Sequence, residues 1–461
     1  MQAYSSAVEA ESSTAAATKL NHNSIEESST NRAIELSTNP FTTPGNSQPV
    51  SRIGSSFALN TPPGPKYFHS RRVKKGTVER PWLDRKDPKE KWVTIIPLLG
   101  IAFGLAVSGV LIWDGLRSVV NHTYCPVLDE NWSNGFNPKL WMKEAEVGGF
   151  GNGQFEQTTN TDENVFVKDG KLYIKPTLQD SKLIETDGSI LNLTKLGICS
   201  SDKFANCVTS TNVTNGSIIN PVKSGRISTR IGPKIKFGRI EVTAQLPAGD
   251  WLWPAIWMLP VDSKYGPWPR SGEIDIMESR GNNHTYRQGG NNIVSSTLHW
   301  GPNPANDGWW TNNVKRMALH TTYSKGFHTF GLEWSEKYLF TYIDTRLLQV
   351  MYSHFEEPLF ARGHFPLSDS NGTKLDDPWS HTGRVNTPFD EDFYLILNVA
   401  VGGTNGWFQD GKSGKPWVDG SPTAKNDFWK ARDSWYPTWK DGGSMIVKSV
   451  KMWQQKGYNG C

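Results

Sequence analysis

Residues 271–278 read Ser-Gly-Glu-Ile-Asp-Ile-Met-Glu, a stretch in which acidic and apolar side chains alternate. This alternation predicts a β-strand with Glu273 and Asp275 on one face and the isoleucines packed in a core. Strict alternation would bury Glu278, and a buried carboxylate without a partner is costly. One extra residue, a β-bulge at Met277, would return Glu278 to the acidic face. The stretch therefore predicts three carboxyl groups close together on one side of a strand.

Two interpretations of this carboxylate cluster are open. A solvated acidic strand face is the simpler one, but like charges so close together disfavour mutual ionisation. The other is the pair of carboxyl groups, about 5 Å apart, that a retaining glycosidase uses. Tryptophans surround the cluster in residues 250–260, at Trp268 and in residues 298–301. Because flat aromatic rings stack on the apolar faces of sugars, these neighbours favour carbohydrate cleavage.

From about residue 126 onward, short alternating runs are separated by Gly, Asn, Asp and Pro. Residues 240–246, three segments within 327–350 and residues 444–454 are typical of strands, and turns are expected at 335–337 and 344–345. No long helical periodicity interrupts them. The pattern predicts an all-β fold, a two-sheet sandwich formed by one domain over residues 126–461. A net charge of +4 in 461 residues gives no reason to expect a nucleic-acid partner.

The N-terminal part has a different composition. Residues 1–65 are rich in Ser, Thr, Asn, Ala and Pro, and we expect them to be disordered. Ten Lys or Arg residues follow between positions 66 and 91, and then residues 92–113 carry no charge. This run is long enough to cross a membrane as a helix, with a tryptophan at each end. A buried helix of a soluble protein is the alternative, whereas a cleaved signal peptide would begin nearer the N-terminus.

The basic residues precede the apolar run, whereas residues 114–130 carry only one, Arg117. The positive-inside rule therefore predicts a cytosolic tail (residues 1–91), a signal anchor (92–113), a short stalk (114–125) and a lumenal or extracellular domain. This is the arrangement of a single-pass type II membrane protein. Potential N-glycosylation sites all lie beyond the apolar run and agree with this orientation: Asn121, Asn131, Asn192, Asn212, Asn215, Asn283 and Asn371.

The four cysteines also lie on the predicted exported side, where disulfide bonds persist. They are Cys125, Cys199, Cys207 and Cys461. No two of them form a Cys-X-X-Cys pair, so a zinc site is disfavoured, and we expect no metal or other cofactor. Sequence alone leaves three pairings open. The favoured one joins Cys199 to Cys207 across a short loop and Cys125 to Cys461 across the ends of the domain, because domain termini often lie close together.

The stretch Ser-Gly-Glu-Ile-Asp-Ile-Met-Glu-Ser-Arg-Gly resembles glycoside hydrolase family 16, in particular its laminarinase-type members. Further matches lie in residues 151–156, 224–230, 237–241, 250–260, 395–403, 427–429 and 435–439. The resemblance covers approximately residues 126–455. It implies a concanavalin A-like jelly roll with a substrate cleft across a concave sheet.

Carried over residue by residue, the resemblance makes Glu273 the nucleophile and Glu278 the acid/base, with Asp275 between them to orient or tune them. The positions that match the family's substrate-binding residues are Asn152, Arg226, Trp253, Trp268 and His299. Three other tryptophans are assigned to packing: Trp257, Trp429 and Trp439. Many members also hold a structural calcium ion through an acidic residue of the last strand. Lys448 stands at that position here, so calcium is not expected there.

The leading hypothesis is a retaining endo-hydrolase of β-1,3- or β-1,3(4)-glucan. Transglycosylation in cell-wall glucan remodelling is a variant of the same chemistry, because another sugar hydroxyl can take the place of water. The alternative is a membrane-tethered, lectin-like protein that binds glucan with little catalysis, since animal glucan-recognition relatives of the family often lack the catalytic glutamates. Glu273 and Glu278 are both present here, which favours the enzyme.

Overall fold

A computed structural model describes residues 72–84, 87–118, 122–369 and 371–461. The tail predicted to be disordered, residues 1–65, lies outside the described residues. So do the sequon residue Asn121 and several of the basic residues that precede the apolar run: Lys66, Arg71, Arg85 and Lys86.

The predicted membrane segment lies within one long helix. A short helix, α1 (Pro81–Asp84), comes before α2 (Glu90–Ser118), which encloses residues 92–113 and continues beyond them. Within Glu90–Gly115, the most apolar window of 18 residues has a mean hydropathy of 2.5, and none of it is buried. Its length and composition are therefore those of a membrane-crossing helix.

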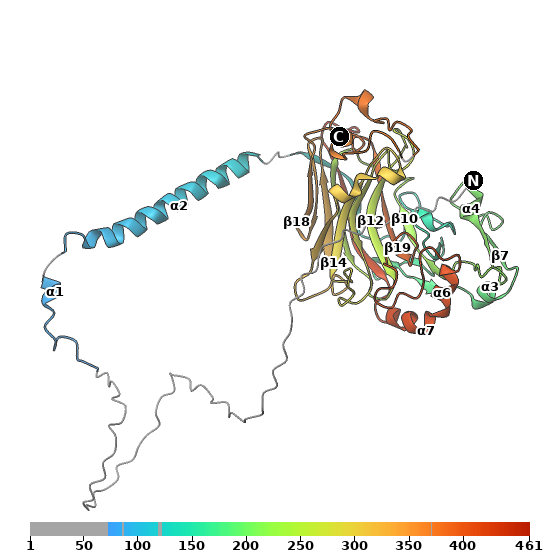
Figure 1. Cartoon of the computed structure of the whole chain (residues 1–461), viewed down its shortest axis with the longest axis horizontal. Helices are drawn as coiled ribbons and strands as arrows, with labels where there is room; N and C mark the ends of the chain where they lie inside the picture. The colour runs from blue at the N-terminus through green and yellow to red at the C-terminus, as the bar shows by residue number, and fades with distance from the viewer. Residues whose placement is uncertain (1–71, 85–86, 119–121, 370) are drawn as a thin grey trace, which may run out of the picture. The chain divides into compact units, whose positions relative to one another are not determined.

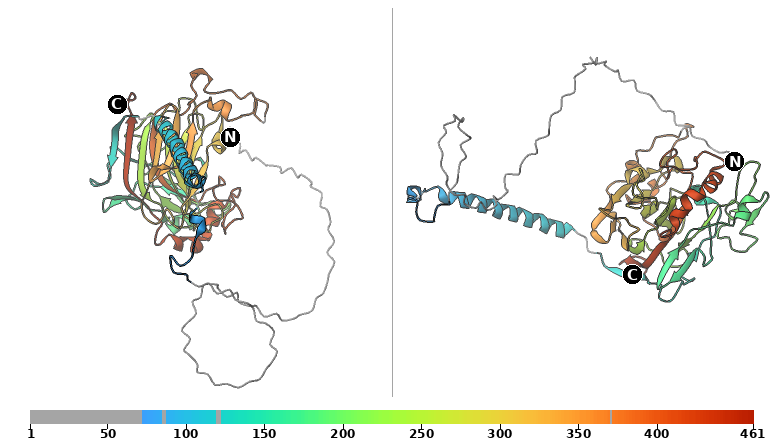
Figure 2. Two further views of the ribbon diagram at one scale, coloured as in Figure 1. Left: turned by 90° about the vertical axis from the view of Figure 1, so that its left-hand side faces the viewer. Right: turned by 90° about the horizontal axis from the view of Figure 1, so that it is seen from below.

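The rest of the chain is dominated by two antiparallel sheets packed as layers (Figure 1), and Figure 2 gives two further views of this β-domain. The first, the β20 sheet, has the order β18-β17-β16-β11-β20-β5-β4, with β1 also paired to β20. Its strands are β1 (Tyr124–Glu130), β4 (Val165–Lys168), β5 (Lys171–Ile174), β11 (Gly238–Gln245), β16 (His328–Trp334), β17 (Tyr338–Ile343), β18 (Thr345–His354) and β20 (Met445–Gln455).

The second layer, the β13 sheet, contains the acidic stretch and has the order β15-β14-β13-β12-β19-β10-β2. Its strands are β2 (Met142–Lys143), β10 (Arg226–Ser228), β12 (Leu252–Pro260), β13 (Glu273–Ser279), β14 (Ile293–His299), β15 (Val314–Met317) and β19 (Phe393–Val401). The prediction of a mostly-β, two-sheet sandwich is therefore confirmed.

Alternating burial explains why these segments form strands. In β11 the side chains of Ile240, Val242 and Ala244 are buried, whereas Glu241 and Thr243 between them are partly exposed. This is the pattern of a strand with one face on a core. Strand β19 differs because all nine of its residues are buried. It lies between β12 and β10 in the β13 sheet, and β12 in turn pairs with the acidic strand β13.

Smaller elements complete the domain, and several of them gather beside the β10 edge of the sandwich (Figure 1). Two small sheets contain β3 (Glu156–Thr158), β6 (Thr177–Leu178) and β9 (Val222–Ser224), and β7 (Ile190–Asn192) with β8 (Val208–Ser210). The short helices are η1 (Gly149–Gly151), α3 (Ser181–Glu185), α4 (Phe204–Cys207), η2 (Pro304–Asn306), η3 (Gly308–Thr311), α5 (Leu359–Arg362), η4 (Ser380–Thr382), α6 (Ala424–Lys430), α7 (Arg432–Trp435) and η5 (Tyr436–Trp439). None of these single-turn and two-turn helices has the length at which periodicity becomes visible in a sequence.

Two disulfide bonds join Cys125 to Cys461 and Cys199 to Cys207, which is the favoured pairing. Cys125 lies in β1 opposite Gln454 of β20, a few residues before Cys461. The strand pairing of β1 with β20 therefore brings the two ends of the β-domain together, and the disulfide bond makes that contact covalent.

Loss of the bond between Cys125 and Cys461 should destabilise the domain more than loss of the bond between Cys199 and Cys207. The two bonds close loops with sequence separations of 336 and 8 residues. The chain-entropy model gives the long loop about 6 kcal/mol of stabilisation and the short loop roughly 2.5 kcal/mol. Denaturant unfolding of the two double Cys→Ser variants, compared with the parent protein, measures both free energies. An equal loss of stability in both variants would contradict this entropic account.

Candidate active site

A bulge in β13 places the three acidic side chains on one face of the β13 sheet. Asp275 pairs with Trp257 and Thr297, whereas Glu278 pairs with Ala255 and Ser295. Between these pairs β13 contains one residue more than either neighbouring strand, as the sequence predicts. The two residues at the bulge, Ile276 and Met277, are both buried.

Glu273, Asp275 and Glu278 consequently share one surface, which we call the acidic face. An indole N–H holds each of the two glutamates. The Nε1 atom of Trp268 donates to Oε2 of Glu273 at 2.8 Å, and that of Trp253 donates to Oε1 of Glu278 at 2.9 Å. Both glutamates remain partly exposed, whereas Asp275 between them is buried. A hydrogen bond donated to a carboxylate favours its ionised form. The two tryptophans therefore orient the glutamates and oppose the effect of burial on them.

His299 joins the acidic face through two aspartates. It lies opposite Glu273 in the pairing of β14 with β13. Its Nε2 atom is 3.3 Å from Oδ2 of Asp275, and its Nδ1 atom is 2.5 Å from Oδ2 of Asp307. The ring of Trp268 is also close, with its centroid 5.7 Å from that of the imidazole. Asp307 was not singled out from the sequence, because only the fold brings it to His299.

Burial and mutual repulsion raise the pKa values of all three carboxyl groups. Burial, and then the charge of Asp275, raise the pKa of Glu273 to about 8. Burial and the charge of Glu278 raise the pKa of Asp275 to about 6. Burial raises the pKa of Glu278 as well, although His299 and the Trp253 indole act in the opposite direction. The three groups therefore lose their protons at higher pH than isolated carboxyl groups do.

The surroundings of His299 favour its protonated form. Burial alone would lower its pKa, but hydrogen bonds to Asp275 and Asp307 and the charge of Asp275 raise the pKa well above 6.5. Glu273, Asp275 and His299 offer ligand atoms within 4.8 Å of one another. A metal ion bound there would require His299 to give up its proton.

Arg226 lies on the acidic face but has its own partners. It pairs with Asn398, which pairs with Ala255, which pairs with Glu278, so a single row of residues crosses four strands. The guanidinium group is buried, and its Nε atom is 2.6 Å from Oε2 of Glu144. Three strand steps separate it from Glu278, roughly 14 Å at the usual strand spacing.

Trp257, which the sequence assigns to packing, lies on the same face. It pairs with Asp275, and its indole N–H donates to Oδ1 of Asn398 at 2.7 Å. The guanidinium of Arg226 stacks 4.7 Å from its ring. Trp257 follows Trp253 by four residues in β12, so alternation within that strand places both side chains on one face. Trp429 and Trp439 are buried, in agreement with packing.

Asn152 follows helix η1 and comes close to the acidic face through its backbone. Its carbonyl oxygen accepts the N–H of Thr404 at 3.0 Å. Gly403 has a φ of +128°, and a Cβ atom there would lie 3.3 Å from that oxygen and 3.9 Å from the ring of Trp253. Asn152, Gly403 and Trp253 thus lie beside one another.

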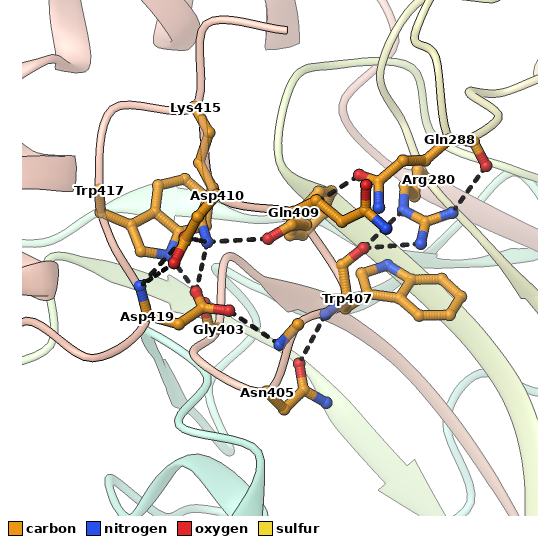
Figure 3. A network of polar contacts seen from close by, with 12 residues as sticks. Arg280, Gln288, Gly403, Asn405, Trp407, Gln409, Asp410, Lys415, Trp417 and Asp419 are labelled. Atoms are coloured by element: carbon orange, nitrogen blue, oxygen red, sulfur yellow. Dashed lines mark hydrogen bonds and ion pairs between the residues drawn. The ribbon is translucent and has the colours of Figure 1, made fainter. Parts of the chain in front are cut away.

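The loop after Gly403 supplies a tryptophan that sequence analysis missed. The ring of Trp407 stacks on that of Trp253, with centroids 4.7 Å apart and an interplanar angle of 12°. Arg280 lies on Trp407, 3.9 Å from its ring centroid, and donates to its carbonyl oxygen from Nε and Nη2 (Figure 3). A contact path therefore runs from Glu278 through Trp253 to Trp407 and Arg280.

Buried ionic contacts support this loop. The ammonium group of Lys415 is buried, binds Asp410 and Asp419 and donates to the carbonyl oxygen of Phe408 (Figure 3). The indole N–H of Trp417 donates to the carbonyl oxygen of Gly403 at 2.8 Å. The loop is thus fixed at both ends, which holds Trp407 against Trp253.

The raised pKa values predict that the folded protein becomes less stable as the pH rises from 5 to 8. A carboxyl group whose folded pKa exceeds its unfolded value takes up a proton on folding, so its stabilising effect is present at low pH and disappears as the pH passes the folded pKa. Glu273, Asp275, Glu278 and the buried Glu156 all have this sign. Thermal unfolding at pH 5, 6.5 and 8 should give a falling midpoint.

The variant Glu273→Gln removes one of these titrations and should reduce the pH dependence of the midpoint. Glu336→Gln, at an exposed turn, is the matched control and should leave it unchanged. A midpoint that rises with pH in the parent protein would contradict the prediction.

Known proteins and one protein family are similar to this chain along most of the β-domain. Residues 174–369 match the family described as Glycosyl hydrolases family 16. The beta-1,3-glucan-binding protein of Penaeus monodon is 38% identical over 345 residues, which cover 72% of this chain and 91% of that protein. Glucan endo-1,3-beta-glucosidase A1 of Niallia circulans is 32% identical over 310 residues, 65% of this chain and 35% of that protein.

Among solved structures, the catalytic domain of an endo-1,3-beta-glucanase (laminarinase) from Thermotoga petrophila is similar at 24% identity and a TM-score of 0.46, covering 73% of this chain and 100% of that one. The extent and identity of the match to the Penaeus monodon protein, together with the family match itself, show that this chain belongs to glycoside hydrolase family 16.

Proposed function

We propose that the β-domain binds β-1,3-glucan and cleaves it as a retaining endo-hydrolase. The names of its relatives support both parts, since they include a beta-1,3-glucan-binding protein and a glucan endo-1,3-beta-glucosidase. Binding has the better support from relatives, because the glucan-binding protein matches over more of its length. Hydrolysis rests on one observation, the grouping of Glu273, Asp275 and Glu278 on one strand face.

The acidic face has the chemistry that a neutral polysaccharide requires. Trp253 and Trp268 present indole rings beside the two glutamates, and Trp407 extends that aromatic surface. Such rings stack on the apolar faces of sugars, while carboxyl and amide groups bind hydroxyl groups. Trp253, Trp268, Asn152, Arg226 and His299 are proposed to contact or position the bound glucan.

In the proposed mechanism, Glu273 attacks the anomeric carbon and forms a glycosyl ester while the bond to the leaving oxygen breaks. Glu278 gives its proton to that oxygen. Glu278 then takes a proton from water, or from a sugar hydroxyl in transglycosylation, and the attacking oxygen displaces Glu273 with a second inversion. Two inversions at one carbon give net retention.

Asp275 has a specific part in this proposal. Glu273 must be ionised when it attacks, yet its pKa is raised to about 8. Asp275 is its acidic neighbour on β13 and lies 3.3 Å from Nε2 of His299. Because two carboxyl groups in contact share their protons as one unit, the proton of Glu273 can move to Asp275 as the substrate binds. Asp275 is thus proposed to hold the proton that the nucleophile must lose.

Replacement of the two glutamates should give distinct kinetic results. Glu273→Gln should abolish release of reducing ends from laminarin, because no ester can form. Glu278→Ala should lower kcat by roughly 10²–10⁴-fold on glucan, the usual value of a general acid and base. It should retain turnover of aryl glycosides with good leaving groups, and azide should restore its rate. Glu336→Gln, at an exposed turn, is the control and should behave as the parent protein.

Two readouts decide between the candidate functions. Laminarin that binds without release of reducing ends would identify a glucan-binding protein with little catalysis. Where hydrolysis occurs, proton NMR of the first product tests the mechanism, because the α-anomer appearing first would mean inversion and would remove the covalent intermediate. Parallel digestion of laminarin and lichenan distinguishes β-1,3- from β-1,3(4)-glucan preference.

We also propose that the protein is a type II membrane protein with its β-domain on the lumenal or extracellular side. The apolar part of α2, the two disulfide bonds and the positions of the sequons support this arrangement. Among the sequon residues that the structure describes, Asn192 is partly exposed and the others are exposed: Asn131, Asn212, Asn215, Asn283 and Asn371. Exposure is what glycosylation requires.

Protease treatment of sealed microsomes should remove an epitope tag placed at the N-terminus and leave the β-domain intact. Enzymatic removal of N-glycans should then reduce the mass of the protected fragment. A protected N-terminal tag would contradict the orientation, and an unchanged mass would contradict the glycosylation.

A further inference from the structure

Most tryptophans that the structure describes in the β-domain are buried, and only a few are exposed. Among residues 122–369 and 371–461, the most exposed tryptophans are Trp268, Trp309 and Trp310, with exposed fractions of 43%, 44% and 58%. Trp268 already belongs to the acidic face through Glu273. The other two are consecutive residues of helix η3 and have no role in the site described above.

Hydrogen bonds tie both ends of the segment around η3 to the acidic face. At its start, Asp307 binds Nδ1 of His299 and accepts the backbone N–H of Trp309 at 3.2 Å. At its end, Asn313 donates from Nδ2 to Oγ1 of Thr297 at 3.0 Å. Thr297 pairs with Asp275, so both anchoring contacts lie on the side of the sheet that carries the carboxyl groups. Residues 307–313 therefore border the acidic face.

Hydrogen bonds and close packing hold residues 307–313 in place. The N–H of Gly308 donates to the carbonyl oxygen of Trp300 at 2.7 Å, and a Cβ atom at Gly308 would lie 2.8 Å from the buried Trp300 ring. The hydroxyl group of Thr311 donates to the carbonyl oxygen of Gly308. Neither Trp309 nor Trp310 stacks on an aromatic ring or a cation in the part of the chain that the structure describes. The exposed indoles of Trp309 and Trp310 therefore belong to a segment whose backbone is held in place.

We propose that Trp309 and Trp310 form a second aromatic platform that binds glucose rings of the same glucan chain, on the β14–β15 side of the carboxyl groups. The occupant is named from the proposed function, on which this inference rests, and its position follows from continuity with the acidic face. After the segment, β15 begins, and its Lys315 pairs with Ser295, which pairs with Glu278. Two strand steps separate β13 from β15, roughly 10 Å, so only an oligosaccharide of several units spans both places.

Asp307 is the positioning residue that couples the platform to the site. One of its oxygens accepts backbone N–H groups of Trp300 and Trp309, and the other binds His299. The same carboxylate therefore fixes the start of the aromatic segment and the orientation of the imidazole. A glucan chain stacked on the platform would meet the carboxyl groups in a fixed register.

The test measures binding of laminari-oligosaccharides of increasing length by calorimetry. The protein is the full chain in detergent with the substitution Glu273→Gln, so that ligand is not cleaved. Adding Trp309→Ala and Trp310→Ala together should weaken binding of the longest oligosaccharide by about tenfold or more, as expected for loss of exposed aromatic anchors. Binding of the disaccharide should not change, because it does not reach the platform.

The matched control is Tyr352→Ala, which removes an exposed aromatic ring from β18 in the other sheet and should leave binding unchanged. Circular dichroism and the unfolding midpoint verify that each variant is folded. Equal affinity of the double variant and its parent for every length would overturn the platform while the proposed function stands. Failure of the Glu273→Gln parent to bind any length would overturn glucan binding itself. A change in oligomeric mass with unaltered sugar affinity would identify a second copy of the chain as the occupant and overturn the inference.

Discussion

The arrangement of the site depends on one irregularity in hydrogen bonding, the extra residue at Ile276–Met277 in β13. Without it, Glu278 would point into the sandwich core, where an ionisable group has no partner. With it, two consecutive apolar side chains are buried, and three acidic ones share a surface. The bulge thus interrupts the regular strand pairing and brings three carboxyl groups close together. The raised pKa values of these groups are the electrostatic result.

Aromatic residues then hold the two glutamates that the bulge brings to one face. Each glutamate accepts an indole N–H, and each of these tryptophans is itself held by another group: Trp253 by the ring of Trp407, and Trp268 by its contact with His299. The orientation of the carboxyl groups is therefore determined by packing at some distance from them. This explains how the loop that holds Lys415 between two aspartates contributes to the geometry of the site through Trp407.

Local patterns were sufficient to predict many of the strands and the bulge, because alternation is visible within short stretches, whereas the sequence left three disulfide pairings open and only favoured the observed one. Residues that reach the site through strand order were not predictable in this way. Trp407 meets Trp253 because β19 pairs with β12, and Asp307 meets His299 because the chain turns back after β14. Trp257 is a different case, since alternation within β12 already places it on the same face as Trp253. The resemblance to family 16 supplied Arg226 and Asn152, which spacing alone would not have found.

The closure of the β-domain by Cys125 and Cys461 has a mechanical consequence. Any pull that reaches the domain through the residues before Tyr124 arrives at the first strand, one residue before the disulfide bond. Because β1 is a strand added to β20, a pull at its end would otherwise break its hydrogen bonds one after another. The covalent bond at Cys125 passes the load directly to the end of β20, which is paired along its length with β11 near the centre of its sheet. A tethered domain closed in this way resists peeling, since force must shear a central strand instead of unzipping an outer one.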